Sequence, residues 1–395
     1  MKDDPVVIVG AARTPIAGFG GGFADMTAPK LGAAAISGAL VKAGLAAADV
    51  EDVTMGLVLA AGQGQAPARQ ASLGAGIPQE TGATTVNKMC GSGMKATMLA
   101  HDNLLAGSHR VMVAGGMESM TNAPYLLPKA RAGMRMGHSQ TKDHMFLDGL
   151  EDAYDKGKLM GEFAENTAET FQFTREAQDA FAITSLDRAL RATEDGTFAR
   201  EITAVTVKDR KGENKVERDE QPMNARPDKI PELKPAFRDG GTVTAANSSS
   251  ISDGAAALVL MRRSEAEMRG LSPLAAIRAH ATYAAQPEWF TTAPIGAVNK
   301  VLEQARWTKA GVDLFEINEA FAVVTMAAIR ELGLSHDEVN IHGGACALGH
   351  PIGASGARIV VSLLNALAKH DLKKGVATLC IGGGEATAMA IERIH

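Results

Sequence analysis

Cysteine is scarce in this chain, with three among 395 residues. These are Cys90, Cys346 and Cys380. Three thiols cannot all pair with one another, and none belongs to a Cys-x-x-Cys motif. The spacing therefore argues against a disulfide scaffold and against zinc, and we expect no metal. Unpaired thiols fit a reducing compartment, and no apolar leader precedes the first apolar run at residues 6–9. We therefore expect a cytoplasmic protein.

Other absences narrow the classes of function. Aromatic residues make up 4% while glycine numbers 42, which predicts an aliphatic core with close backbone packing. The net charge is −5 and no basic stripe stands out, so we expect no nucleic acid partner. No apolar stretch approaches the length that spans a bilayer, so we expect no membrane partner. A dinucleotide fingerprint and a Walker A motif are also missing.

Short apolar runs alternate with helical patterns along the chain. Residues 6–9, 111–114 and 377–381 indicate buried strands that end at glycine, and residues 29–43 predict a helix that stops at Gly44. This alternation predicts an α/β fold with largely parallel sheets. The chain is too long for one ordinary core, so we expect two or three domains.

A faint internal repeat divides the chain. Residues 90–93 (Cys-Gly-Ser-Gly) are followed by a helix, a strand and the glycine turn at 115–118. Residues 353–356 (Gly-Ala-Ser-Gly) are followed by the same elements and the turn at 382–385. Two similar βαβ-type halves predict a duplication with a site between them.

The repeat predicts the domain boundaries. The N-terminal half comprises residues 1–122, completed by about residues 241–270, and the C-terminal half comprises residues 271–395. Residues 123–240 fall outside the repeat and are richer in charge, proline and methionine. They are predicted to form an inserted loop domain.

Cys90 is the first candidate for chemistry. It follows a strand-like stretch and precedes a helical stretch that starts near Ser92, an arrangement similar to a nucleophile elbow. The N-terminus of a helix is expected to lower the pKa of such a thiol, because the dipole and free amides stabilise the thiolate. The alternative is a small buried cysteine at a tight turn, but the flanking glycines favour the nucleophile.

His350 and Cys380 are candidates for moving protons. His350 lies within the glycine-rich residues 343–358 and is a candidate base for Cys90. Cys380 ends an apolar strand before a second glycine-rich turn. It is either a core thiol or the second acid/base of a two-step reaction.

Two polar segments leave alternatives open. Asn318 follows the apolar residues 314–317 and opens a helix that ends near Gly333. It is either the N-cap of that helix or an amide aimed at an oxyanion or a water. Residues 247–254 precede an apolar strand, and are either a plain loop or a hydrogen-bonding segment for an extended polar ligand.

At these residues the chain resembles the thiolases, and the acetyl-CoA acetyltransferases among them, nearly end to end. The matching segments are residues 10–15, 87–93, 114–120, 160–161, 164–165, 253–257, 318–322, 343–358 and 380–384. The resemblance implies a duplicated thiolase fold in five layers, αβαβα, with an inserted loop domain and assembly as a homotetramer. It also implies a reversible Claisen condensation of two acetyl-CoA molecules to acetoacetyl-CoA and CoA through an acetyl-cysteine. CoA is then substrate and product, and no cofactor is expected.

The resemblance also assigns roles to residues. Cys90 is the expected nucleophile, His350 its base, and Cys380 the acid/base at the methyl carbon of the second acetyl-CoA. A water held by Asn318, together with His350, is expected to form one oxyanion hole. The backbone amides of Cys90 and Gly382 are expected to form the other.

Four further residues are expected to contact the substrate. Ser249 matches a serine that contacts pantetheine, and Met160 and Phe237 match residues near the acyl group. Arg226 is a candidate for the adenine end of CoA, although its loop does not align cleanly.

Three departures from the family pattern concern specificity and the last turn. Leu159 stands where many short-chain thiolases have His, and Phe290 lies in residues 287–291, where Met-Gly is common. Both positions concern the acyl pocket. Glu385 follows the last glycine turn, where Met or Gln and then Gly are common, and the sequence assigns it no role.

Other activities compete with this one. A degradative 3-ketoacyl-CoA thiolase with a broader chain-length range is the main alternative. A CoA- or lipid-binding protein that lost turnover is expected to lack a catalytic residue, whereas Cys90, Asn318, His350 and Cys380 are all present. A ketoacyl synthase that uses a carrier protein is expected to lack the second cysteine.

Overall fold

The computed structural model describes residues 4–209 and 212–394, so the expected lack of a leader lies partly outside the described residues. Within them, ten strands form one sheet. The strand order is β12 (Leu314–Ile317), β13 (Lys374–Ile381), β14 (Glu385–Arg393), β11 (Ala275–Ala284), β1 (Val6–Arg13), β10 (Ser252–Arg262), β5 (Val111–Ser119), β3 (Asp52–Gly56) and β4 (Gly82–Val86), with β2 (Ala17–Gly18) on β10.

The expectation of largely parallel sheets is wrong. Only the pairs β12–β13, β3–β4 and β3–β5 are parallel among the described strands. The strand β10 runs antiparallel between β1 and β5. The strand β14 returns from β13 through the short turn at residues 382–384, and a turn of that length can join only antiparallel neighbours.

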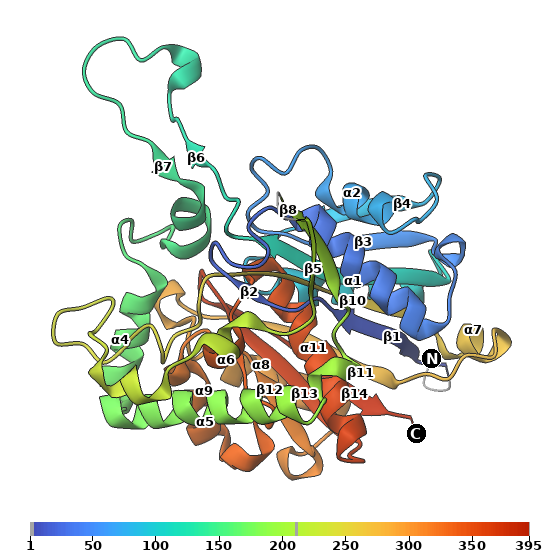
Figure 1. The fold of residues 1–395 in the computed structure, drawn as a ribbon. Helices are drawn as coiled ribbons and strands as arrows, with labels where there is room; N and C mark the ends of the chain where they lie inside the picture. Colours follow the sequence, from blue (N-terminus) through green and yellow to red (C-terminus); the bar gives the residue numbers. More distant parts are fainter. Residues whose placement is uncertain (1–3, 210–211, 395) are drawn as a thin grey trace.

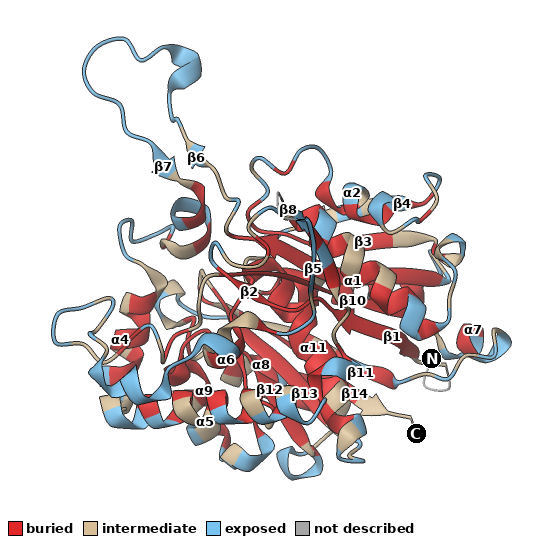
Figure 2. Cartoon of the chain, in the orientation of Figure 1, coloured by how far each residue is buried: buried red, intermediate tan, exposed pale blue. Residues whose placement is uncertain are grey.

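Helices and sheet form five layers (Figure 1). The outer face of the N-terminal half carries α1 (Ala28–Ala43) and α2 (Pro67–Gly74), and the outer face of the C-terminal half carries α8 (Ala293–Ala305) and α9 (Ala322–Leu332). The central layer is α3 (Ser92–Ala106) and α11 (Ile352–Lys369). Their aliphatic side chains share one core with both halves of the sheet, which Figure 2 shows as buried. This is the expected αβαβα arrangement.

The two central helices meet at backbone level. A Cβ atom on Gly93 would lie 2.8 Å from the backbone nitrogen of Ala357, and one on Gly356 would lie 2.5 Å from that of Met94. Only glycine permits so close an approach. The glycines of the internal repeat therefore bring the start of α3 to the start of α11, the two points where the sequence places the nucleophile and the base.

Residues 123–240 spread over both halves of the fold. The helix α5 (Arg175–Glu194) packs against α9 and the short α10 (Ala345–Leu348) in the C-terminal half. The hairpin of β8 (Val205–Asp209) and β9 (Gly212–Val216) contributes Val205 and Val207 to the core of the N-terminal half. The segment also holds α4 (Met160–Phe171) and α6 (Glu220–Asn224), and α7 (Arg263–Met268) follows β10.

A buried cation ties this segment to the first strand. Arg13 is fully buried at the end of β1, and its Nε lies 2.6 Å from Glu201 Oε1, while an NH1 group lies 2.7 Å from Asp219 Oδ1. The two carboxylates raise the pKa of the guanidinium against the opposing effect of burial. The motif at residues 10–15 thus anchors the inserted segment.

An arm projects from the body between β5 and α4 (Figure 1). It includes the two-residue strands β6 (Tyr125–Leu126) and β7 (Lys142–Asp143), which pair antiparallel. The arm exposes four large apolar side chains, those of Tyr125, Leu127, Met134 and Met136. These side chains are not packed into a hydrophobic core of the described residues.

The central helix α11 is long and apolar enough to cross a membrane by length and composition alone. The expectation that no stretch approaches this length is therefore wrong. However, 83% of the 18-residue window is buried inside the protein. The helix is apolar on most sides because α3 and both halves of the sheet surround it.

Candidate functional site

Cys90 lies in a tight turn between β4 and α3, as expected. The preceding residue, Met89, has a φ of +46°, a left-handed conformation that is rare for residues other than glycine. Local bonds hold the turn: Asn87 Oδ1 accepts the Met89 N–H at 2.9 Å, and Ser92 Oγ accepts the Lys88 N–H at 2.8 Å. A strained and well-anchored turn before a helix is typical of a nucleophile elbow.

The environment of the Cys90 thiol differs from the expectation. Burial raises the pKa of Cys90 to about 11, although the backbone N–H groups of Gly382 and of Cys90 itself favour the thiolate and lower it. The charge of Glu118 raises the pKa further. The prediction that the helix N-terminus lowers this pKa is wrong, because desolvation outweighs the local dipoles. Both amides belong to the expected oxyanion hole, and that role stays a prediction.

Cys380 lies at the end of β13, and its side chain is buried in an apolar cluster with Phe163, Phe290 and Phe321. Burial raises the pKa of Cys380 well above its ordinary range, and the charge of Cys90 raises it further. The two thiols therefore interact electrostatically, and the site disfavours two thiolates at once.

His350 is buried between Gly349 and Pro351 at the start of α11. Its Nδ1 lies 2.6 Å from Ser355 Oγ, and that hydroxyl donates to the Pro351 carbonyl at 3.0 Å. A hydroxyl that donates to a carbonyl accepts from its other neighbour, so this network assigns the proton to His350 Nδ1. The opposite ring nitrogen, Nε2, is buried and has no partner among the described residues.

Burial lowers the pKa of His350 to about 3, and the nearby Arg358 charge adds to this effect. The imidazole is therefore neutral at physiological pH. With the proton on Nδ1, the lone pair on Nε2 is available to accept a proton, which is the property that a general base needs.

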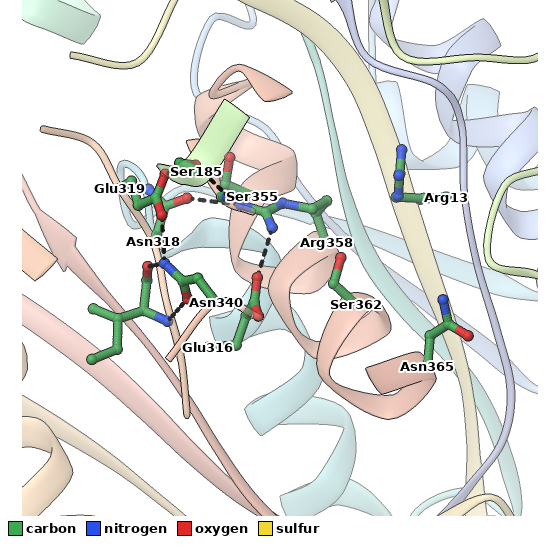
Figure 3. Close-up of polar contacts among 12 residues, drawn as sticks. Arg13, Ser185, Glu316, Asn318, Glu319, Asn340, Ser355, Arg358, Ser362 and Asn365 are labelled. Carbon is green, nitrogen blue, oxygen red and sulfur yellow. Dashed lines mark hydrogen bonds and ion pairs between the residues drawn. The ribbon is translucent and has the colours of Figure 1, made fainter. Parts of the chain in front are cut away.

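Asn318 is not the N-cap of α9, because that position belongs to Phe321. The Asn318 side chain is buried, and its Oδ1 accepts from an Arg358 NH2 group at 3.1 Å. Its Nδ2 then faces His350 Nδ1 at 3.4 Å. Figure 3 shows Arg358 between Asn318 and Glu316, whose Oε1 lies 3.1 Å from the guanidinium. The ion pair with Glu316 thus fixes the orientation of the amide.

Three of these supporting residues were missed by sequence reasoning. Ser355 and Arg358 lie within the glycine-rich residues 343–358, at offsets of five and eight from His350, so both follow it on the same helix. Glu118 was visible only as the end of a glycine turn. Its carboxylate accepts the N–H groups of Val58, Leu59 and Gly353 at 2.8–3.1 Å, and burial raises its pKa to about 7. Nothing in the sequence predicts that these partners converge.

The structure gathers most of the expected acyl-pocket residues beside Cys380. Met160, Phe237 and Phe290 belong to or pack against its apolar cluster. The sulfur of Met160 would lie 3.4 Å from a Cβ at Gly382, so this side chain covers the glycine turn. Leu159 is half-buried at the N-cap of α4, next to Met160.

The two residues expected to contact CoA, Ser249 and Arg226, lie in different parts of the structure. Ser249 Oγ donates to the Ala320 carbonyl at 3.0 Å, so Ser249 lies beside the Asn318 loop. Arg226 is exposed before the short helix at Pro227–Glu232. In the described part of the chain, no contact joins Arg226 to the residues around Cys90.

A group of side chains that could hold a metal lies elsewhere. The ligand atoms of His101, Asp102 and His280 are all within 4.8 Å of one another. They already bond to each other, since Asp102 Oδ1 lies 3.0 Å from His101 Nδ1 and 2.9 Å from His280 Nε2. Burial lowers the pKa of His101, so its ring is neutral and can hydrogen-bond to Asp102. Hydrogen bonding accounts for this group.

Comparison with known proteins identifies the family. The thiolase N-terminal domain model matches residues 6–264, and the thiolase C-terminal domain model matches residues 271–393. An acetyl-CoA acetyltransferase of Cupriavidus necator is 47% identical over 98% of this chain and 99% of its own length.

Two solved structures have the same fold. A Bacillus anthracis acetyl-CoA acetyltransferase superposes with a TM-score of 0.96 at 40% identity, over 99% of both chains. An Ascaris suum thiolase in complex with coenzyme A superposes with a TM-score of 0.93 at 41% identity, over 99% of this chain and 100% of its own. The chain therefore belongs to the thiolase family.

Proposed function

We propose that this protein is an acetyl-CoA C-acetyltransferase, which joins two acetyl-CoA molecules to acetoacetyl-CoA and free CoA, and reverses that reaction by thiolysis. The observation that carries the proposal is the pair of interacting thiols, Cys90 and Cys380, together with the close approach of α3, which follows Cys90, to α11, which follows the buried neutral His350. The names of the similar proteins and the coenzyme A complex of the Ascaris suum relative support CoA thioesters as substrates.

The first step is acetyl transfer to Cys90. Its sulfur attacks the carbonyl carbon of acetyl-CoA while His350 Nε2 accepts the thiol proton. The new S–C bond replaces the bond to the CoA sulfur, and the CoA thiolate leaves with the proton from His350. The amides of Gly382 and Cys90 favour a thiolate at the reacting sulfur, and we assign to them the stabilisation of the negative charge that develops on the thioester oxygen.

The second step is carbon–carbon bond formation. The Cys380 thiol first gives up its proton to solvent. Its thiolate then removes a proton from the methyl carbon of a second acetyl-CoA, and the resulting carbanion attacks the acetyl carbon on Cys90. The Cys90 sulfur leaves as a thiolate and takes the proton that Cys380 now carries, after which Cys380 regains a proton from solvent. An acetylated Cys90 cannot ionise, so no thiolate at this position opposes the ionisation of Cys380 during the second step.

These steps balance without a resident cofactor, since CoA is consumed and released. A water held by Asn318, whose amide orientation Arg358 fixes, is suited to stabilise the enolate oxygen of the second acetyl-CoA. His350 Nε2 can donate to that oxygen only in the state in which it has accepted a proton.

Acyl-chain length is the finer part of the proposal. The aromatic ring of Phe290 lies against Phe163 with centroids 6.3 Å apart, and that of Phe237 lies against Phe321 at 6.0 Å. Both pairs line the cluster around Cys380. Packed rings near the second thiol favour a two-carbon unit over the longer acyl groups of a degradative 3-ketoacyl-CoA thiolase.

The test is CoA-dependent thiolysis of 3-ketoacyl-CoA esters of increasing length, starting with acetoacetyl-CoA. A sharp maximum of kcat/KM at four carbons is expected. Equal or higher values on longer esters would favour the degradative enzyme instead. Absence of thiolysis with any ester, or full activity of Cys90→Ala, would overturn the thiolase mechanism for this chain.

We also propose a homotetramer, for which the projecting arm is the support. Its exposed Tyr125, Leu127, Met134 and Met136 fit burial against other copies of the chain. Light scattering after size exclusion is expected to give four chains per particle, and a variant with the arm shortened is expected to give fewer. The cytoplasmic location and the lack of nucleic acid or membrane partners stay predictions.

A further inference from the structure

Glu385, the residue that departs from the family pattern, contacts the turn that carries the nucleophile. It is the first residue of β14, and its Oε2 lies 2.5 Å from Lys88 Nζ. Both side chains are partly shielded, with exposed fractions of 33% for Glu385 and 20% for Lys88. The two residues are 297 positions apart in the chain, so the ion pair joins the two halves of the fold.

Each residue of the ion pair lies close in sequence to a group that takes part in the proposed reaction. Lys88 stands two residues before Cys90, and Glu385 stands three residues after Gly382, whose backbone N–H favours the Cys90 thiolate. The two turns are in contact, because a Cβ atom on Gly91 would lie 2.4 Å from Ile381 Cδ1. The ion pair therefore spans the gap between the Cys90 turn and the Gly382 turn. Lys88 belongs to the turn that carries the Cys90 amide, and Glu385 follows the turn that carries the Gly382 amide. The relative position of these two turns sets the geometry of the proposed oxyanion hole.

Both segments need a fixed relative position because neither is part of a regular element. Gly383 and Gly384 have φ values of +94° and +89°, and glycine in such turns has the most conformational freedom of any residue. Asn87 Oδ1 and Ser92 Oγ hold the Cys90 turn to itself, and Asn87 Nδ2 donates to the Val58 carbonyl of the same half at 3.5 Å. Among the described residues, the Lys88–Glu385 ion pair connects the Cys90 turn to the end of the Gly382 turn.

We propose that Lys88 and Glu385 are positioning residues that hold the Gly382 amide against the Cys90 sulfur during acetyl transfer. This inference depends on the function proposed above. The pair touches no reacting atom, so its effect is on the rate of the chemical step through the placement of Gly382. Small displacements of groups that stabilise a transition state reduce rates strongly.

The experiment measures acetylation of Cys90 by acetyl-CoA, followed by rapid quench and intact-protein mass spectrometry. In Glu385→Ala, the acetylation rate constant at saturating acetyl-CoA is expected to fall about tenfold, with the half-saturation concentration changed less than about twofold. Glu385→Gln retains a hydrogen-bond acceptor and is expected to recover part of the rate. The double variant Lys88→Glu with Glu385→Lys, called the exchanged pair, is expected to acetylate Cys90 faster than either single charge reversal.

The chain offers a matched control. Glu392 lies on the same strand, and its Oε2 pairs with Arg278 Nε at 2.6 Å, far along β14 from the glycine turn. Glu392→Ala loses a similar ion pair and is expected to acetylate at the wild-type rate. Because thermal unfolding is measured for every variant, a general loss of stability is recognised separately from a loss of rate.

The outcomes distinguish the two proposals. If wild-type Cys90 is not acetylated, the proposed function fails and the positioning role fails with it. If wild-type Cys90 is acetylated and Glu385→Ala and Glu385→Gln both match Glu392→Ala, the positioning role alone is overturned. The positioning role is also overturned if the exchanged pair folds but acetylates Cys90 no faster than the single charge reversals.

Discussion

Ser355→Ala tests whether the tautomer of His350 is essential to the site. Ser355 Oγ is the partner of His350 Nδ1 at 2.6 Å, and both groups are buried. Removal of the hydroxyl leaves Asn318 Nδ2, 3.4 Å away, as the remaining described neighbour of Nδ1. An amide NH2 group is a donor, so it favours the tautomer with the proton on Nε2, which cannot accept a proton from Cys90.

The magnitude follows from the lost bond. A buried polar group without its partner costs about 1–3 kcal/mol. If that cost falls on the transition state, acetylation of Cys90 slows by about fivefold to 150-fold. The assay is the pre-steady-state acetylation of Cys90 by acetyl-CoA, with the pH dependence of kcat/KM for thiolysis as a second readout.

A second serine on the same helix supplies the control. Ser362 is buried on α11 and donates to Glu201 Oε1 at 3.2 Å, so Ser362→Ala also removes one buried hydrogen bond. It is expected to lose stability without a comparable loss in the acetylation rate. If the two variants acetylate Cys90 equally fast, the assignment of the Nδ1 proton and its importance to the base are refuted.

Three further perturbations test other parts of the mechanism. Cys380→Ala is expected to leave acetylation of Cys90 within about threefold of wild type while condensation falls by at least about 100-fold; equal losses in both steps, measured by quench and by acetoacetyl-CoA formation, would contradict the separate roles. The pKa values of about 11 for Cys90 and about 3 for His350 predict that both groups are neutral at pH 7. Alkylation of Cys90 by iodoacetamide should therefore rise about tenfold per pH unit from pH 7 to 10, because only the thiolate reacts; a plateau near neutral pH would instead indicate a thiolate–imidazolium pair. Phe290→Ala opens space beside Cys380 and is expected to raise kcat/KM for six-carbon relative to four-carbon esters by about tenfold, at a cost of about 3–5 kcal/mol in stability; an unchanged ratio would remove Phe290 from the acyl pocket.

Local signals predicted much of the secondary structure. Thr174 caps α5 and accepts the Ala177 N–H, as a threonine directly before a helix commonly does. Gly44 ends α1 in a left-handed conformation. These features depend on neighbours within a turn or two of the chain, so the sequence carries enough information for them. Strand direction does not depend on local neighbours, and the parallel sheet predicted from alternation was wrong.

The identity of the candidate catalytic residues was also accessible from sequence, because glycine-rich turns around Cys90, His350 and Cys380 are unusual in themselves. Their electrostatics were not. The pKa of Cys90 follows from how much water the folded site excludes, and a helix N-terminus visible in the sequence predicted the opposite sign. Glu385 had no role until folding placed it next to Lys88.

The sequence by itself determined the chemical groups, the turns that hold them and the family to which the chain belongs, since each of these is written in short segments of fixed spacing. The tertiary structure alone decided which groups meet. Glu118, Arg358 and Ser355 act through partners that arrive from distant segments, or through a proton whose location depends on buried neighbours. Desolvation and long-range contacts exist only once the two halves have closed around α3 and α11, which is why no local pattern could report them.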